Sequence, residues 1–506
     1  MFKNRNCSCC TIISLFFMIA GCNKESQKKA TDSDDSESID LISDSDSEAD
    51  SETNTSMDRP TDTISGTDIT SDTDITLDTD TRADTASDTD TASETDTPSD
   101  VDTVFHADSH TGITDWAYRR EIIVFSNSGD TFIDRQVPIN LDNTFSYFNM
   151  GHSDGSDLRF STTSNGSNFD LDYYIEQWNV GGDSLIWVRV DDISAMPTSI
   201  YMFYGNSSAN SAAVSESAMF PSNCISSSAT SISTVNVCDI LHIQAGQQVW
   251  VGKGNITEVK ARKIIIEGTL IGDGSGYADD VTIGRGGSAT SNDAGGGGGG
   301  GYGNLGGSGG TESLGYDGGA GGEVYGHPTA NSIQMGSYGG AGTPVEDLPD
   351  ANRPGVRGGG AVSLNADQIE VSGTIQMNGA HAAVTQTELP VYMGGGGSGG
   401  GILLNGNMVT LSGNLTAIGG NGGWSEFEDS PENTYNNYYP GGGGGSGGRI
   451  KVFYDYSLTD DSTISVAGGN GGPTGYTHGQ NGDDGFSWQA QFDYEVSVSV
   501  KPEETI

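Results

Sequence analysis

The sequence predicts an all-β protein: an antiparallel β-sandwich followed by a Gly-rich parallel β-helix, or solenoid, after a long disordered acidic linker. Three observations support this order. Asp, Ser and Thr dominate residues 23–110, short apolar runs separated by turn signals fill residues 115–222, and 65 of the 76 glycines follow residue 250. We therefore expect four segments, with boundaries at 1–21, 22–114, 115–222 and 223–506.

The first segment has the features of an export signal. Lys3 and Arg5 precede the apolar run TIISLFFMIA, which is too short to span a membrane as an ordinary helix. The run ends in Ile19-Ala20-Gly21-Cys22, which resembles the lipobox of bacterial lipoprotein signal peptides. The resemblance implies cleavage before Cys22 and a lipid anchor on its sulfur. Asn23 after it favours the outer membrane. The alternative is a chance Cys after an ordinary secretory signal.

The second segment carries much of the charge. The formal net charge is -47, and roughly half of the acidic excess lies between residues 31 and 110. Such a balance disfavours nucleic acid or an anionic membrane face as partner, because both would be repelled. An alternation of Thr and Asp buries too little apolar surface to fold, so we expect an extended stalk. A low-affinity Ca²⁺ reservoir is the alternative, since carboxylates are ligands for this ion.

The third segment contains short strands. The runs YRREIIVF, QVPINL, DLRFST, LDYYIEQW, SLIWVRV and SIYMFYG are separated by turn signals such as SNSGD and VGGD. Period-two alternation is clearest in 185–190. Many short strands at this spacing, without helical periodicity, are typical of a β-sandwich.

Five ordered motifs in this segment resemble a known family. WAYRR, DGSDLRF, YIEQW, IWVRV and YMFYGN, which begin at residues 116, 154, 174, 186 and 201, look like the bacterial domain of unknown function 2341. That family occurs in exported proteins beside concanavalin-like modules and has no established activity. The resemblance therefore implies a sandwich and an exported location, and no reaction.

Within these motifs we expect mostly structural residues. Tyr118, Trp187 and Tyr201 lie in strand patterns and are predicted core residues, with ligand platforms as the alternative. Asp157, Arg159 and Glu176 could form an ion-pair network, and a catalytic carboxylate pair is the alternative.

Two cysteines, Cys224 and Cys238, remain after the predicted cleavage. In an oxidising exported compartment they are expected to form one disulfide, and two free buried thiols are the alternative. No CxxC pair is present, and the seven His residues lack metal-ligand spacing.

The last segment is a repeat. Apolar residues recur at a constant separation of 40 positions: Val362, Leu364, Ile369, Val371, Ile375 and Met377 match Ile402, Leu404, Val409, Leu411, Leu415 and Ala417. They come in pairs at i and i+2, which predicts three short strands per unit, each with one face inward. Such a unit buries its apolar face only by stacking on its neighbours, so we expect a parallel β-helix. Residues 234–252 are expected to add a leading coil and 486–500 a closing strand pair.

The Gly runs lie between the predicted coils, and we expect them to be long surface loops whose tight turns tolerate only Gly. Collagen is excluded because no strict Gly-X-Y period is present. Ca²⁺ binding by RTX-type nonapeptides is a weak possibility, because GGNGG and GQNGDDG occur but the tandem motif is missing. This part loosely resembles the Gly-rich solenoids of bacterial adhesin-like surface proteins. Matches to a dinucleotide fingerprint at GYGNLG and to a nucleophile elbow at three GGSGG segments are attributed to chance.

The best candidate binding segment is GGWSEFEDSPENTYNNYYPGG, where aromatic residues stand among Asp, Glu and Asn. Exposed rings stack on sugar faces, while amides and carboxylates bind hydroxyls. The candidate ligand-binding residues are Trp424, Phe427, Tyr435, Tyr438 and Tyr439. The alternative is that these rings fold back over the solenoid.

These observations predict a non-enzymatic, lipid-anchored cell-surface protein that displays a glycan-binding or adhesive surface on a stalk. Its partners would be the membrane, through the anchor, and an extracellular glycan or another cell. No catalytic residue, cofactor or metal ligand is assigned. One alternative is a structural coat protein without a ligand. A second is a β-helix polysaccharide-degrading enzyme, which rests on fold analogy alone.

Overall fold

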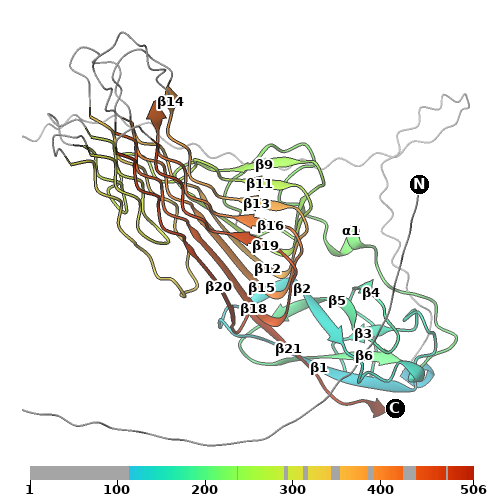
Figure 1. Cartoon of the computed structure of the whole chain (residues 1–506). Helices are drawn as coiled ribbons and strands as arrows, with labels where there is room; N and C mark the ends of the chain where they lie inside the picture. The colour runs from blue at the N-terminus through green and yellow to red at the C-terminus, as the bar shows by residue number, and fades with distance from the viewer. Residues whose placement is uncertain are drawn as a thin grey trace, which may run out of the picture. The chain divides into compact units, whose positions relative to one another are not determined.

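The computed structural model describes residues 113–235, 237–289, 295–311, 317–343, 354–385, 393–425, 440–473 and 477–506. The predicted signal peptide, and the predicted stalk apart from residues 113 and 114, lie outside them. The described chain is all-β, with antiparallel sheets first and parallel sheets after them (Figure 1). Both belong to one unit, residues 100–506.

The antiparallel part consists of two sheets around one core. One sheet has the order β21-β1-β6-β3, with β22 also paired to β1, and the other has the order β2-β5-β4. Their bounds are β1 Tyr118–Ser126, β2 Phe132–Leu141, β3 Arg159–Ser161, β4 Tyr173–Gln177, β5 Ser184–Ile193, β6 Thr198–Tyr204, β21 Val496–Val500 and β22 Glu504–Thr505. Alternate side chains such as Ile122, Val137 and Ile186 are fully buried between the sheets. Short helical turns occur at η1 Ile113–Asp115, η2 Tyr147–Asn149 and α1 Glu216–Met219.

The parallel part contains two six-stranded parallel sheets. The long-strand sheet has the order β20-β18-β15-β12-β10-β8, and the short-strand sheet has the order β19-β16-β13-β11-β9-β7. The first comprises β8 Ile240–Ile243, β10 Ile256–Ile266, β12 Ala361–Val371, β15 Gly401–Leu411, β18 Arg449–Asp460 and β20 Phe486–Gln491. The second comprises β7 Ser231–Ile232, β9 Gln248–Val251, β11 Thr269–Ile271, β13 Thr374–Gln376, β16 Asn414–Thr416 and β19 Thr463–Ser465.

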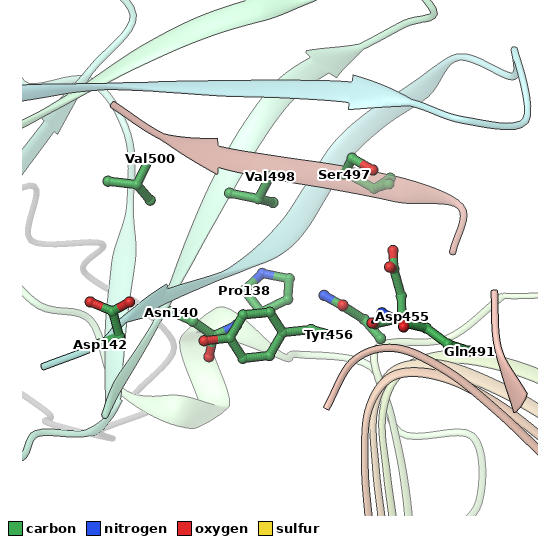
Figure 2. Close-up of a pocket in the computed structure, with 11 residues that line it drawn as sticks. Pro138, Asn140, Asp142, Asp455, Tyr456, Gln491, Ser497, Val498 and Val500 are labelled. Atoms are coloured by element: carbon green, nitrogen blue, oxygen red, sulfur yellow. Dashed lines mark hydrogen bonds between the residues drawn. The ribbon is translucent and has the colours of Figure 1, made fainter. Parts of the chain in front are cut away.

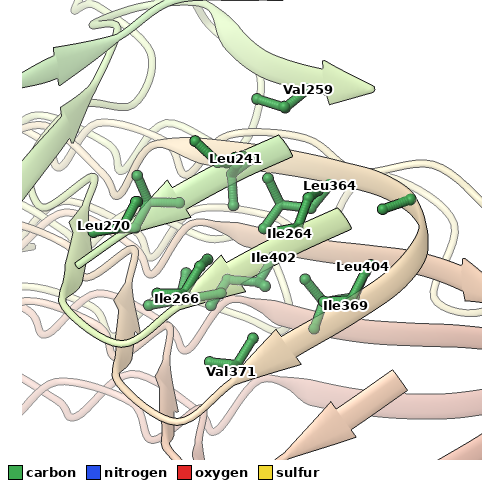
Figure 3. Packing of buried hydrophobic residues seen from close by; sticks show 14 of the residues in the cluster. Leu241, Val259, Ile264, Ile266, Leu270, Leu364, Ile369, Val371, Ile402 and Leu404 are labelled. Carbon is green, nitrogen blue, oxygen red and sulfur yellow. The ribbon is translucent and has the colours of Figure 1, made fainter. Parts of the chain in front are cut away.

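The predicted repeat register is confirmed. Val362 pairs with Ile402, Val371 with Leu411, and Ile375 with Leu415. Each unit has two strands rather than the predicted three, because β12 and β15 continue through the corner between their two apolar pairs. The ladder there runs on through Asn365–Asn405 and Ala366–Gly406. The inward residues of successive units stack into one core (Figure 3).

The prediction that the Gly runs are surface loops is wrong for the described residues. Those in 295–301, 394–401 and 441–448 are buried. They belong to a set of extended segments without strand pairing that lie side by side beyond the strand arrows in Figure 1. We call this set the glycine bundle; it comprises 284–289, 295–303, 305–311, 317–325, 333–343, 354–360, 377–383, 393–400, 417–423, 440–448, 466–473 and 477–485.

Backbone hydrogen bonds in the glycine bundle follow a period of three. The amides of residues 296, 297 and 298 donate to carbonyls of residues 310, 393 and 287, and the next three amides donate to the same three segments in the same order, at 307, 396 and 284. Residues 395–400 and 442–447 repeat this pattern with their own neighbours. A β-strand directs its amides to two neighbours in one plane, whereas three directions per turn are those of the polyproline II conformation. Each such segment is therefore bonded to three neighbours.

Glycine is required in this bundle because of close approach between backbones. A Cβ atom on Gly299 would overlap the carbonyl of Gly444, and one on Gly298 would overlap the carbonyl of Ala320. Neither glycine has a positive φ. The sequence therefore selects glycine for the spacing between chains, and not for the tight turns that we expected.

The predicted closing strand pair is divided between the two parts. β20 ends the long-strand sheet, as expected, but β21 returns to the antiparallel part and pairs with β1 from Ile122–Val500 to Ser126–Val496. The segment 223–506 is thus not wholly a repeat. The reason is that β1 would otherwise be an edge strand, and the alternating Val496, Val498 and Val500 pack on the antiparallel core.

Candidate ligand-binding groove

A buried contact joins the antiparallel part to the parallel part. Leu185 and Trp187 of β5 pack with Met408 of β15 in one apolar cluster, together with Met219 and Phe220. Around this cluster Lys263 forms ion pairs with Glu176 at 3.0 Å and with Glu216 at 3.2 Å. Apolar contacts therefore hold β5, and ion pairs hold β4 and α1, against the long-strand sheet.

Beside this joint lies a groove of about 440 Å³ between β2, β18 and β21. Figure 2 shows its walls, with the β21 side chains on one side and Tyr456 on the other. Its lining residues are Pro138, Asn140, Asp142, Asn407, Asp455, Tyr456, Gln491, Val496, Ser497, Val498 and Val500. The volume is within the roughly 300–1,000 Å³ of ordinary small-molecule sites.

Tyr456 supplies an accessible aromatic ring in the groove. The residue is 55% exposed, and a β-bulge directs it there: Gly406 pairs with Tyr454 but Met408 pairs with Ser457, so β18 has one residue more than β15. Such a bulge turns a side chain out of the regular alternation. Burial of the phenol oxygen raises the pKa of Tyr456, as do the nearby Asp183 and Asp142, so the hydroxyl stays protonated and can donate.

Hydrogen bonds hold three polar side chains of the groove, those of Asp142, Asp455 and Gln491, in place. Asp142 Oδ1 accepts from the amide of Thr144 at 2.8 Å and from its hydroxyl at 2.6 Å, and these bonds lower the pKa of Asp142. Asp455 Oδ2 accepts from the amide of Tyr494 at 3.1 Å, while Gln491 Nε2 donates to the carbonyl of Asp455 at 2.6 Å. The groove thus combines a ring, two carboxylates and several amides.

Most of the aromatic residues that the sequence suggested as a binding site lie outside the described residues. This applies to Phe427, Tyr435, Tyr438 and Tyr439, and also to the lipidation candidate Cys22. Trp424 is described: it begins β17 (Trp424–Ser425), pairs in parallel with Val384 of β14 (Val384–Thr385) and is half-buried.

Sequence reasoning did not identify Tyr456 or its neighbours. The available signal was the extra sequence around residues 454–458 in the last repeat, which departs from the spacing of the earlier units. A break in a regular register is where a bulge and a redirected side chain are expected.

Cys224 and Cys238 are joined by a disulfide, with Cα atoms 5.5 Å apart. Cys238 is buried in the core of the parallel part, and Cys224 packs against that core. The bond closes the segment that leads from the antiparallel part into the first strands of the repeat.

Asp157 and Glu176 have different partners and do not form a paired site. The buried Asp157 carboxylate accepts hydrogen bonds from the backbone amides of residues 151, 152, 205 and 206 at 2.7–3.2 Å. Arg159 donates to the carbonyls of Leu158 and Asn210. Glu176 accepts from the Trp187 indole at 2.6 Å, in addition to its pair with Lys263. These contacts stabilise the fold.

The side chains of Tyr118, Trp187 and Tyr201 are not free platforms. Trp187 is fully buried, and the half-buried Tyr118 and Tyr201 pack on apolar clusters of the antiparallel part. The serines of two GGSGG segments, Ser398 and Ser446, are fully buried in the glycine bundle, where their hydroxyls bond to backbone groups.

Two kinds of feature are absent from the described part of the chain. It contains no group of three or more His, Cys, Asp or Glu residues placed to hold a metal ion. Nor does any of its helices have the length and hydropathy to cross a membrane.

Comparison with known proteins gives one family. Residues 154–221 match the model of the Domain of unknown function (DUF2341), which covers β3 to β6 and α1. Neither the curated proteins nor the solved structures contain a match. The match contains four of the five motifs on which the resemblance rested, whereas WAYRR, which begins at residue 116, lies outside the matched residues; the family supplies no activity.

Proposed function

We propose that this chain is a non-enzymatic, exported surface protein, anchored to a bacterial membrane through lipid on Cys22, that binds a glycan in the groove beside Tyr456. Residues 22–114 would act as the stalk that separates the anchor from the folded part. The parallel part would be a β-solenoid that carries one wall of the groove. The observation that carries the proposal is an exposed phenol ring surrounded by fixed carboxylates and amides.

The chemistry of the groove favours an uncharged sugar. The ring of Tyr456 offers an apolar face for a pyranose, and Asp142 and Asp455 accept hydrogen bonds from hydroxyls. Asn140 and Gln491 add groups that both donate and accept. With two carboxylates in the lining and no cation, the groove disfavours anionic glycans.

A coat protein without a ligand is the second candidate. The glycine bundle favours it, because a lattice of backbone hydrogen bonds gives rigidity and offers few side chains for recognition. Glycan binding separates these two functions.

The test is binding of the purified full-length protein to an array of neutral and acidic glycans, followed by calorimetry on the best neutral ligand. Tyr456→Ala should weaken binding about 5- to 150-fold, since loss of a stacked ring costs about 1–3 kcal/mol. Phe148→Ala removes an exposed ring outside the groove and is the matched control. Trp424→Ala tests the aromatic segment separately. If no glycan binds, or if only Trp424→Ala weakens binding, the groove is not the site. If the glycan is not shortened after incubation with the protein, the protein binds it without hydrolysing it.

A further inference from the structure

A second hollow lies along the segment 492–495, which leads from β20 to β21. It consists of two adjoining cavities of about 340 Å³ and 130 Å³ that share Asn365, Tyr494 and Glu495. The larger is lined by amides from both parts of the molecule, including Asn127, Asn331 and Asn405, and the smaller by Lys260 and Arg262.

Asparagine side chains form a hydrogen-bonded ladder along this hollow. The last amide oxygen of the ladder has no hydrogen-bond partner among the described residues. Asn405 Nδ2 donates to Asn365 Oδ1 at 2.7 Å, and Asn365 Nδ2 donates to the Ser363 hydroxyl at 3.2 Å. The next position of the ladder is Phe453, which has no polar side chain to continue it. As a result Oδ1 of Asn405, a residue only 6% exposed, has no hydrogen-bond partner among the described residues.

Arg262 provides a second unsatisfied group. It occupies the corner position of β10 that matches Asp367 of β12, between the pairs Ala261–Ala366 and Lys263–Gln368. The Asp367 carboxylate accepts its two side-chain hydrogen bonds from Arg135, and it attracts Arg262 without a hydrogen bond between them. Arg262 Nε is buried without a hydrogen-bond partner, and no ion pair joins its guanidinium to another described residue. A guanidinium left in this state favours an added acceptor.

The charges that line the hollow favour an uncharged ligand. Lys260 and Arg262 are opposed by Asp130, Asp493 and Glu495, so a carboxylate or phosphate would meet more negative than positive groups. A sugar hydroxyl can both accept from Arg262 and donate to an amide oxygen such as that of Asn405.

We propose that this hollow is a second subsite for a neutral sugar, in which Arg262 and the Asn365–Asn405 ladder bind hydroxyl groups. The proposal deepens the proposed glycan-binding function and rests on it. The two subsites lie along one corner of the long-strand sheet, because Asn407 of the first groove follows Asn405 of the second hollow two residues later on β15. The protein therefore has two places to bind one kind of ligand.

The test is isothermal titration of the full-length protein with neutral glucose, galactose and mannose hexasaccharides, using those that bind on the array. The wild type should bind two molecules per chain. Arg262→Ala should weaken one of the two sites at least tenfold, because a hydrogen bond to a charged group contributes about 1.5–3 kcal/mol. Tyr456→Ala should weaken the other site. Lys253→Ala removes an exposed cation outside the hollow and should leave both sites unchanged.

Loss of binding in Arg262→Ala could also result from misfolding, and Asn331→Ala controls for this. Asn331 is exposed and lines only the larger cavity, so its replacement should leave the fold intact. It should weaken the same site as Arg262→Ala. One molecule per chain, lost with Tyr456→Ala and unaffected by Arg262→Ala and Asn331→Ala, would overturn the second subsite and leave the first intact. Absence of binding by every hexasaccharide would overturn both.

Discussion

Arg135 of β2 and Asp367 of β12 form an ion pair in which the guanidinium Nη2 donates to both carboxylate oxygens at 3.1 Å. Arg135 is fully buried and Asp367 nearly so, and the pair joins the antiparallel part to the corner of the long-strand sheet. A second bond from Arg135 Nη1 reaches Glu495 at 3.2 Å, in the segment that leads into β21. This pair is therefore central to the joint on which both candidate subsites depend.

Removal of one partner from this ion pair should lower the free energy of unfolding. Arg135→Met leaves the Asp367 carboxylate buried without its main partner, and we expect the free energy of unfolding to fall by about 3–5 kcal/mol. The double variant Arg135→Met with Asp367→Leu should recover most of the loss, because it removes the stranded charge. Urea unfolding followed by tryptophan fluorescence measures both; equal losses in the single and double variants would show that the charge is not the cause.

Adding even one methyl group inside the glycine bundle should lower the stability of the protein. In Gly299→Ala the new Cβ would overlap the Gly444 carbonyl, so we expect a loss of at least about 1–3 kcal/mol, the usual cost of overpacking. Gly252→Ala is the control, because the nearest atom to its Cβ would be the Thr257 hydroxyl at 3.9 Å. Thermal unfolding should shift for the first variant and stay constant for the second. A similar midpoint for both would contradict the close packing.

Lys451 should make stability depend on pH in the alkaline range. Its buried Nζ donates to the carbonyls of His327, Ala330 and Ser332 at 2.6–3.0 Å, while burial and the charge of Arg449 lower the pKa to about 8. Between about pH 8 and the ordinary value of 10.5 the unfolded chain binds more protons than the folded one. The free energy of unfolding should therefore rise with pH in this window, by at most about 1.4 kcal/mol per pH unit from this group.

Comparison with Lys451→Met isolates this contribution, since other groups titrate in both proteins. The difference in unfolding free energy between wild type and variant should increase from pH 8 to pH 10.5 in favour of the wild type. A constant difference over that range would show that the amine keeps its ordinary pKa.

The disulfide should stabilise the start of the parallel part. Cys224 and Cys238 are 14 residues apart, and a bond closing a segment of this length contributes about 3 kcal/mol by restricting the unfolded chain. Replacing both by Ser should lower the unfolding midpoint, and reduction of the wild type should produce the same shift. An unchanged midpoint after confirmed reduction would refute this role.

The sequence predicted the register and the inward residues of the repeat correctly, although not the number of strands per unit, because the apolar residues follow a simple rule. Leu411 and Leu415 stack on Val371 and Ile375 as the 40-residue spacing requires. Trp187 likewise lies in a core, as its strand pattern indicated. Periodicity of side chains was sufficient for these positions.

The sequence did not predict the glycine bundle, because a run of glycines has no pattern of side chains from which packing can be inferred. Gly299 resembles a loop residue until its neighbours, Gly307 and Gly444, are known. Tyr456 was missed for another reason: the bulge that exposes it depends on the pairing of β18 with β15. Both features are set by contacts between distant segments, which one sequence does not show.

The return of β21 to β1 has a mechanical consequence. Tyr118 near the start of the folded chain pairs with Thr505 near its end, so both ends leave from the same sheet. A pull on the chain before Tyr118 loads β1 in shear against β6 and β21, with which it shares antiparallel ladders. Shear stretches many hydrogen bonds at once, whereas peeling breaks them singly. When the opposing load acts on the antiparallel part, the glycine bundle lies outside the path of the tension, and the antiparallel ladders of β1 determine the resistance to force.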